Sequence, residues 1–392
     1  MINKQMYELG SKRSVIRELF EFGRQLKAER GEDKVFDFSL GNPMIAPPDA
    51  ITKKIQKLSE QEGIHKYTSA QGDINVLSSI ANSLTRKYNI DLNEGNIYMT
   101  CGAAASLTIS LKAICNKDDE VLIVKPYFPE YKVFSANAEA KVVEVGHDDK
   151  FQIDFKDLEK KISKKTKAII INSPNNPSGA IYTEETIKRL ADILIEKKRK
   201  YGNQIFVISD EPYRELVYDD VKVSNIISYY DDVLMCYSFS KSLSLPGERI
   251  GYICVSSKMA NAREVYLAVC GSGRALGFVC APSIFQRLVA DSLDEKPRIE
   301  EYKKNRDLIY SSLKEYGYEC VHPDGAFYLF IKSPLKDTNE FAELAKVKGI
   351  LLVPGEGFGA KEYLRLSYCV SYDTIKLSLP YFKELMEEIK RK

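Results

Sequence analysis

Histidine is scarce in this sequence, and the cysteines are dispersed rather than paired. Only three of the 392 residues are histidines, and the eight cysteines include no closely spaced Cys-x-x-Cys pair. Structural zinc sites usually combine such a pair with histidines or with a second pair, so the sequence offers no candidate metal site. Dispersed cysteines are typical of free thiols, and we therefore expect a protein of a reducing compartment.

Long apolar runs are also absent from the sequence. No stretch approaches the roughly 18 uncharged apolar residues that a membrane-spanning helix needs. The first residues, MINKQMYELGSKRSVIREL, contain no apolar core like that of a signal peptide. We therefore expect the protein to be cytoplasmic.

Neither sign of charge is in clear excess. Lys and Arg number 57, against 55 Asp and Glu. This balance produces no long-range field that would attract nucleic acid or a charged membrane surface. A small molecule is the ligand that we expect instead.

The middle of the chain alternates short apolar runs with helical patterns. Runs rich in β-branched residues predict strands at 121–124, 168–171, 205–209, 233–237 and 249–255. Between two of these runs, the apolar side chains of residues 187–195 repeat with the spacing of an amphipathic helix. This alternation predicts an α/β fold with a mostly parallel sheet that helices cover.

The pattern changes from about residue 285 onward. Helices are predicted at 282–293 and 301–316, and strands follow at 326–331 and 363–370. We interpret residues 284–392 as a smaller C-terminal α+β domain and residues 46–283 as the large domain. Residues 1–45 contain an amphipathic helix at 15–27 and the strand-like VFDFSLG, and we expect this segment to join the small domain.

Polar residues follow three of the predicted strands. SPNNPSG comes after Ile171, DEPY after Ser209 and SFSK after Tyr237. In open α/β sheets the ligand crevice lies outside the carboxyl ends of the strands, so these motifs should converge there.

Lys241 and Asp210 are the candidates for chemistry within these motifs. A lysine beside phosphate-binding groups can form a Schiff base with a pyridoxal aldehyde, although a lysine taken alone is more often a surface charge. Asp210 ends a buried strand, where a carboxylate needs a cationic partner such as the pyridinium nitrogen of that cofactor. Taken alone, this aspartate is equally well explained as a helix cap or a turn residue.

The motifs NPSG, SDEPY, SFSK and RIG occur in this order, between SLGNP near the start of the chain and YLRLSY near its end. In this combination the sequence resembles the class I aminotransferases, fold-type I pyridoxal-phosphate enzymes related to aspartate aminotransferase. The resemblance implies an α/β large domain with a mostly parallel seven-stranded sheet and a smaller α+β domain. It also implies ping-pong exchange of an amino group between an L-amino acid and a 2-oxo acid, with 2-oxoglutarate as the expected acceptor.

The resemblance also implies roles for individual residues. Lys241, Asp210 and Tyr213 would be catalytic: Lys241 would bind the aldehyde of pyridoxal 5'-phosphate and carry the substrate's α-proton, and Asp210 would face the pyridine nitrogen. The other cofactor ligands would be Asn176 and Tyr213 at the phenolic oxygen, Phe128 against the ring, and Ser238, Arg249, Gly102, Ala103 and Ala104 at the phosphate.

Substrate and partner contacts follow from the same resemblance. Arg365 would clamp the substrate α-carboxylate, with Gly41 and Asn176 beside it. Tyr67 would reach the phosphate of the neighbouring subunit, which makes a homodimer the expected active unit; a surface tyrosine in a turn is the alternative explanation.

The substrate is not determined by the sequence. Some relatives that act on aspartate carry a lysine where this chain has Ala104, and Arg13 and Arg274 are alternative cations for a second carboxylate. Glu248 occupies a position where the family commonly has a bulky aromatic residue, and no physical reason for this change is apparent.

Two other functions are alternatives to amino-group transfer. A C–S β-lyase shares the same scaffold and the same carbanion chemistry, and a ligand-binding regulator without turnover is disfavoured by the joint presence of Lys241, Asp210 and Arg365. The glycine-rich stretches 271–274 and 355–359 do not fit a dinucleotide-binding motif, and we expect turns there.

Overall fold

The structure is a computed structural model that describes residues 2–11 and 15–391. Its centre is a seven-stranded sheet with the order β2-β8-β7-β6-β5-β3-β4. The strands are β2 (Ile97–Thr100), β3 (Glu120–Val124), β4 (Lys141–Val145), β5 (Thr166–Asn172), β6 (Phe206–Asp210), β7 (Val233–Ser238) and β8 (Gly251–Val255). β4, β3, β5, β6 and β7 pair in parallel, whereas β8 is antiparallel to both β7 and β2. The predicted α/β fold with a mostly parallel seven-stranded sheet is confirmed.

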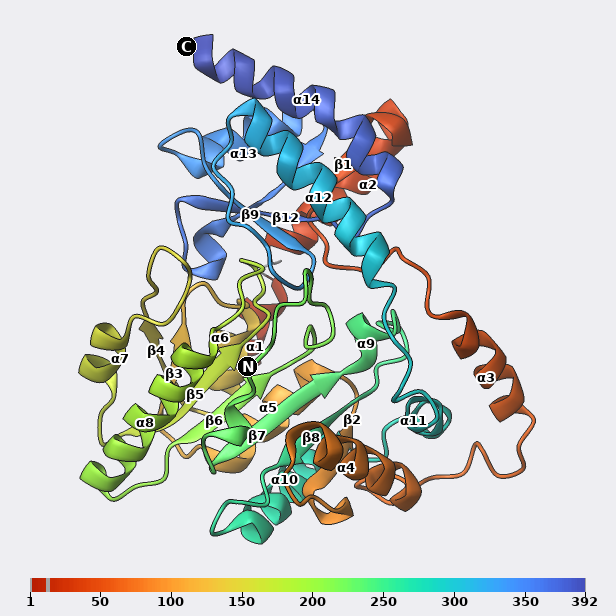
Figure 1. The fold of residues 1–392 in the computed structure, drawn as a ribbon, viewed down its shortest axis with the longest axis vertical. Helices are drawn as coiled ribbons and strands as arrows, with labels where there is room; N and C mark the ends of the chain where they lie inside the picture. The colour runs from red at the N-terminus through yellow and green to blue at the C-terminus, as the bar shows by residue number, and fades with distance from the viewer. Residues whose placement is uncertain (1, 12–14, 392) are drawn as a thin grey trace.

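Helices cover both faces of this sheet (Figure 1). Side chains alternate along β3, so that Val121 and Ile123 face one layer while Leu122 and Val124 face the other. The first layer contains α5 (Ala103–Ile114), α6 (Glu130–Asn137) and α10 (Ala262–Leu276). The second contains α3 (Asp49–Ser59), α4 (Ile74–Tyr88), α7 (Phe155–Lys161), α8 (Glu184–Tyr201), α11 (Ser283–Ala290) and the 3-10 turn η3 (Ile226–Ser228), with η2 (Glu94–Asn96) before β2. Burial on both faces explains why the strands are continuous apolar runs in the sequence.

Helix α8 shows how local sequence sets the ends of these elements. The Thr183 side chain accepts a hydrogen bond from the backbone N–H of Thr186, and two glutamates stand in the first turn. Lys198, Arg199 and Lys200 lie in the last turn, and Gly202 ends the helix in a left-handed conformation. The predicted amphipathic helix is therefore confirmed, and its basic run closes the helix.

A second core lies beyond one end of the sheet, at the top of Figure 1. It contains β9 (Tyr328–Lys332), β11 (Val353–Pro354) and β12 (Tyr363–Ser367) in one sheet. Around that sheet are α12 (Ile299–Tyr316), α13 (Thr338–Val347), η4 (Gly355–Phe358) and α14 (Tyr372–Arg391). We call this group the C-terminal core. The short helix α9 (Phe239–Ser242) directly follows β7 and belongs to the first core.

Residues 15–38 pack against the C-terminal core and contain α2 (Val15–Arg30), η1 (Glu32–Lys34) and β1 (Phe36–Asp37). The preceding helix α1 (Lys4–Ser11) has no buried residue. β1 pairs in parallel with β10 (Ile350–Leu351), and Phe36 and Phe38 are buried in the C-terminal core. The segment that follows β6 also enters this core, through Tyr213, Leu216 and Tyr218.

Several predicted boundaries are wrong. The strand expected at 249–255 begins at Gly251, because Arg249 has a positive φ of 51° and cannot continue a strand. The helix expected at 282–293 ends at Ala290, and the strand expected at 363–370 ends at Ser367. Gly271 and Gly273, expected in a turn, lie inside α10. Among the described residues, no helix is long and apolar enough to cross a membrane.

Candidate active site

A cavity of about 280 Å³ lies where β5, β6 and β7 end. The motifs that follow these three strands all contribute to its wall, as the carboxyl ends of parallel strands do in open α/β sheets. The predicted site residues that line it are Gly41, Ala103, Ala104, Phe128, Asn176, Asp210, Tyr213, Ser238, Lys241, Arg249 and Arg365.

Lys241 projects into this cavity from α9, the short helix that follows β7. Its Nζ donates a hydrogen bond of 2.6 Å to the carbonyl oxygen of Gly41. Burial lowers the pKa of Lys241 to about 8, and the positive charges of Arg365 and Arg249 act in the same direction. The lowered pKa leaves part of the amine uncharged near neutral pH, and the uncharged amine is the nucleophilic form.

Asp210 ends β6 and is almost completely buried. Its Oδ2 accepts a hydrogen bond of 2.6 Å from the Tyr131 hydroxyl, whereas its Oδ1 has no partner among the described residues. Burial raises the pKa of this carboxyl to about 7. An unpaired buried carboxylate oxygen is a site for a cationic donor, and the protonated ring nitrogen of pyridoxal phosphate is a group of that kind.

Arg365 lies in the middle of β12, with its guanidinium buried between two aromatic rings. The ring centroids of Tyr328 and Phe358 are 4.8 and 4.9 Å from it. It donates to the Ser39 carbonyl at 2.6 Å and to Asn176 Oδ1 at 3.0 Å, but its Nε has no partner in the described part of the chain. Burial without a carboxylate lowers the pKa of Arg365, so the site favours an anionic ligand.

Tyr213 and Gly41 meet at Tyr328. The hydroxyls of Tyr213 and Tyr328 are 2.8 Å apart, and burial raises the pKa of Tyr213 well above its usual value. A Cβ atom on Gly41 would lie 2.1 Å from the Tyr328 oxygen. Only glycine therefore allows the backbone to pass this close to the cavity.

The part of the cavity at the start of α5 is suited to an anion. Gly102 precedes α5 with a positive φ of 89°, and no side chain caps the first turn of that helix, where Ala103 and Ala104 lie. A Cβ atom on Gly102 would come within 2.8 Å of Arg249 Nη2. Free backbone N–H groups at a helix N-terminus, together with an arginine and the Ser238 side chain, form a typical phosphate site.

Among the described residues singled out in the sequence, Gly102, Tyr67, Arg274 and Glu248 do not line this cavity. Tyr67 lies between α3 and α4 and is 94% exposed. Arg274 is exposed on α10, and Glu248 precedes Arg249 without lining the cavity, so its departure from the family pattern stays unexplained. Arg13 falls outside the described residues.

Several residues of the site were missed in the sequence, and three of them have a clear role. Tyr131 holds Asp210, Tyr328 holds Tyr213, and Ile16 of α2 contributes to the cavity wall. Tyr131 belongs to the segment PYFPEY, which also contains the predicted cofactor residue Phe128. Tyr328 lies in the strand predicted at 326–331. Their contacts join positions 79 and 115 residues apart, which no local pattern reveals.

Metal ligands and disulfides do not contribute to the described structure. Within residues 2–11 and 15–391, no group of at least three His, Cys, Asp or Glu side chains is arranged to hold a metal ion. All eight cysteines are free thiols.

Comparison with known proteins identifies the family. Residues 33–377 match the family described as aminotransferase class I and II. A probable aspartate aminotransferase from Methanocaldococcus jannaschii is 32% identical over 389 residues, which cover 96% of this chain and 98% of that protein. A (5-formylfuran-3-yl)methyl phosphate transaminase from the same organism is 33% identical, covering 92% of this chain and 94% of its own.

The fold has a close match among solved structures. The crystal structure of an aminotransferase from Eubacterium rectale superimposes with a TM-score of 0.97 at 49% identity, covering 99% of both chains. None of these three relatives is described as a lyase, so they give no support to the β-lyase alternative. The chain belongs to the class I and II aminotransferases, and it is a pyridoxal-phosphate-dependent aminotransferase.

Proposed function

We propose that this cavity binds pyridoxal 5'-phosphate through Lys241 and exchanges an amino group between an L-amino acid and a 2-oxo acid, with 2-oxoglutarate as the acceptor. One observation carries this proposal. A buried lysine, a carboxylate oxygen without a donor on Asp210 and an arginine nitrogen without an acceptor on Arg365 line the same cavity. These are the groups needed to hold an aldehyde, a protonated ring nitrogen and a carboxylate.

Asp210, Asn176, Tyr213 and Phe128 would hold the cofactor ring. When bound, pyridoxal phosphate withdraws electrons from the substrate's α-carbon, and this effect is strongest while its ring nitrogen is protonated. The unpaired Asp210 oxygen would keep that proton in place. Asn176 and Tyr213 would donate hydrogen bonds to the phenolic oxygen, and Phe128 would stack on the ring face.

The phosphate would be bound at the start of α5. Backbone N–H groups of Ala103 and Ala104 and the side chains of Ser238 and Arg249 line that end of the cavity, and Gly102 leaves room for them. The helix N-terminus and the guanidinium both favour a doubly charged anion.

Lys241 would also carry the proton that leaves the substrate's α-carbon. Its lowered pKa makes the released amine a proton acceptor near neutral pH. Arg365 and Asn176 would bind the α-carboxylate next to it, and the Gly41 backbone would approach the same group. The amino group and the carboxylate would thus be fixed on either side of the reacting carbon.

We propose a homodimer as the active unit. Tyr67 is 94% exposed, and Ile74 and Val279 near it are also exposed apolar side chains. The two segments are joined by a hydrogen bond from Cys280 N to the Ala70 carbonyl, so they form one surface. Tyr67 would complete the phosphate site of the neighbouring subunit. Arg274 lies near the same surface and does not line the cavity of its own chain, so the only substrate it would reach is the one bound in the neighbouring subunit.

We further propose that residues 46–283 form the large domain and residues 284–392 the small domain, which residues 1–45 join. The C-terminal core and the pairing of β1 with β10 support this division. A cytoplasmic location is proposed from the composition and the free thiols.

A two-step spectral assay tests the proposed activity. Purified protein loaded with pyridoxal phosphate is mixed with a panel of L-amino acids, and 2-oxoglutarate is added afterwards. We expect loss of the visible cofactor band with the amino donor and its return with the oxo acid, as ping-pong exchange requires. Pyruvate and ammonia formed without an acceptor would point to a lyase, and an unchanged spectrum would contradict both activities.

A further inference from the structure

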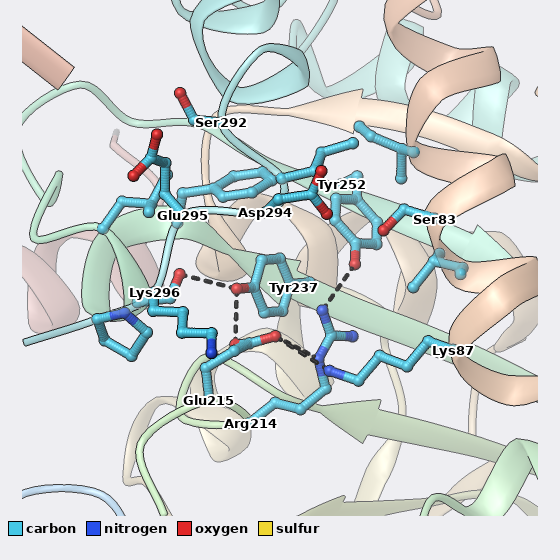
Figure 2. A pocket seen from close by; sticks show the side chains of 17 residues that line it. Ser83, Lys87, Arg214, Glu215, Tyr237, Tyr252, Ser292, Asp294, Glu295 and Lys296 are labelled. Carbon is cyan, nitrogen blue, oxygen red and sulfur yellow. Dashed lines mark hydrogen bonds and ion pairs between the residues drawn. The ribbon is translucent and has the colours of Figure 1, made fainter. Parts of the chain in front are cut away.

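A second cavity is lined by residues of the segment that follows β6, of β7 and of α9 (Figure 2). Its volume is about 210 Å³, and its wall contains Arg214, Glu215, Tyr237, Ser242 and Tyr252. These side chains belong to a buried polar network that the proposed chemistry does not use.

Arg214 is the centre of this network, and its side chain is only 8% exposed. Its Nε donates to Glu215 at 2.8 Å, its Nη1 to Glu211 at 3.1 Å and its Nη2 to the Tyr252 hydroxyl at 3.2 Å. The guanidinium also lies 4.2 Å from the centroid of the Tyr237 ring. Arg214 Nη1 also donates to the Met235 sulfur at 3.3 Å. Arg214 is therefore fixed by four hydrogen bonds and an aromatic face.

Glu215 connects Arg214 to the strand and helix that carry Lys241. Its Oε1 accepts from Arg214 and, at 3.3 Å, from Lys87 Nζ, and its Oε2 accepts a hydrogen bond of 2.7 Å from the Tyr237 hydroxyl. The Tyr237 and Ser242 oxygens are 2.8 Å apart. A tyrosine hydroxyl has one proton, and Tyr237 gives it to Glu215, so Ser242 donates the hydrogen bond to Tyr237.

The neighbours of these residues in sequence face the active site. Tyr213 precedes Arg214, and Lys241 precedes Ser242; both line the active-site cavity. Tyr213 is held on its other side by the C-terminal core, through Tyr328. Through these hydrogen bonds, Glu215 connects the segment that contains Tyr213 to the helix that contains Lys241, outside the active-site cavity.

We propose that Glu215 is a positioning residue that fixes Tyr213 and Lys241 relative to each other through Arg214, Tyr237 and Ser242. Glu215 does not line the active-site cavity, so it acts on the cofactor through these neighbours. The inference rests on the proposed roles of Tyr213 and Lys241, and it goes beyond them by assigning a function to the network behind them.

Two variants test this inference. Glu215→Gln removes the charge and keeps the shape, and Tyr237→Phe removes the connecting hydroxyl without changing any charge. Glu295→Gln is the matched control, because Glu295 lines the same cavity at similar exposure (29% against 25%) but pairs with Lys54. Thermal unfolding of each cofactor-free protein checks that the fold is intact.

The main measurement is the pH midpoint at which the visible band of the bound cofactor titrates. Tyr213 lowers this midpoint when it holds the phenolic oxygen ionised, so a displaced Tyr213 raises it. Loss of a negative charge near a nitrogen cation would lower it instead. The two explanations of a Glu215→Gln effect therefore differ in sign.

We expect the midpoint to rise in both variants, kcat to fall about tenfold with little change in KM, and Glu295→Gln to behave like the wild type. We also expect the double variant to resemble either single variant, since both break the same connection. The inference would be overturned if the midpoint falls in Glu215→Gln and does not change in Tyr237→Phe, or if it changes in neither variant. If Glu215→Gln does not fold, the midpoint of Tyr237→Phe alone decides. A wild-type protein without a visible band would refute the proposed function instead.

Discussion

Asp210 and Lys241 have pKa values that burial has moved toward each other. The carboxyl has a pKa of about 7 and the amine a pKa of about 8, because neither charge has a counter-ion among the described residues. Groups with shifted pKa values are common at catalytic sites, where a ligand supplies the missing partner. In this cavity, a ring nitrogen and an aldehyde would be those partners.

The burial of Asp210 predicts a pH-dependent stability of the cofactor-free protein. The folded-state pKa of about 7 lies above the usual value of 3.8, so the folded state binds more protons than the unfolded state between these pH values. The free energy of unfolding should therefore fall as the pH rises from 4 to 7. In Asp210→Asn this contribution should be absent, and urea unfolding at several pH values measures the difference. Equal pH slopes for the two proteins would refute the expectation.

At the scale of elements, the start of α5 depends on Gly102. This residue has a positive φ, and a Cβ atom on it would lie only 2.8 Å from Arg249 Nη2, so there is no room for a side chain. Gly202, which ends α8, also has a positive φ, but a Cβ there would meet nothing within 4 Å.

Gly102→Ala and Gly202→Ala form a matched pair. Both place a side chain on a backbone with positive φ. This costs about 1 kcal/mol of stability at Gly202, which is in the αL region, and about 1–3 kcal/mol at Gly102, whose ψ of 173° lies in a region nearly restricted to glycine. Only Gly102→Ala should also weaken binding of pyridoxal phosphate, by about tenfold or more, because its new methyl group displaces Arg249 at the phosphate site. Fluorescence titration of the cofactor-free proteins measures both affinities. Equal affinities would show that the phosphate does not bind at this turn.

The central strands of the sheet were predictable from sequence because they are buried on both faces, whereas β2 and β4 were not predicted. β3, β5, β6 and β7 appear as short β-branched runs, and the polar motifs after the last three mark the site. The start of β8 was not predictable, since Arg249 adopts a conformation that an apolar run does not reveal. α10 was missed around Gly271 because glycines usually mark turns, and here packing of the surrounding helix overrides that preference.

At the scale of the whole molecule, contacts between distant segments were beyond the reach of sequence patterns. Asp210 is held by Tyr131 of α6, and Glu215 contacts Tyr237 of β7. Motif positions indicated which residues lie at the end of the sheet, but not which side chains hold them in place. The contribution of Tyr67 depends on a second chain and stays a prediction.

Mixed dimers test that prediction. Lys241→Ala and Tyr67→Ala would each impair both sites of the proposed homodimer, at cofactor concentrations near the wild-type affinity. In a mixed dimer, one site combines the intact Lys241 of one chain with the intact Tyr67 of the other. Refolding the two variants together at equal amounts should restore about a quarter of the wild-type activity. No gain over the separate variants would show that Tyr67 does not act across the interface.

The direct test of the central claim is the identity of the lysine that binds the cofactor. Protein loaded with pyridoxal phosphate is reduced with borohydride, which makes the link to a lysine amine permanent, and is then digested and analysed by mass spectrometry. We expect the added phosphopyridoxyl mass on the peptide that contains Lys241. Modification of a different lysine with Lys241 left free, or no stable modification at all, would contradict the account.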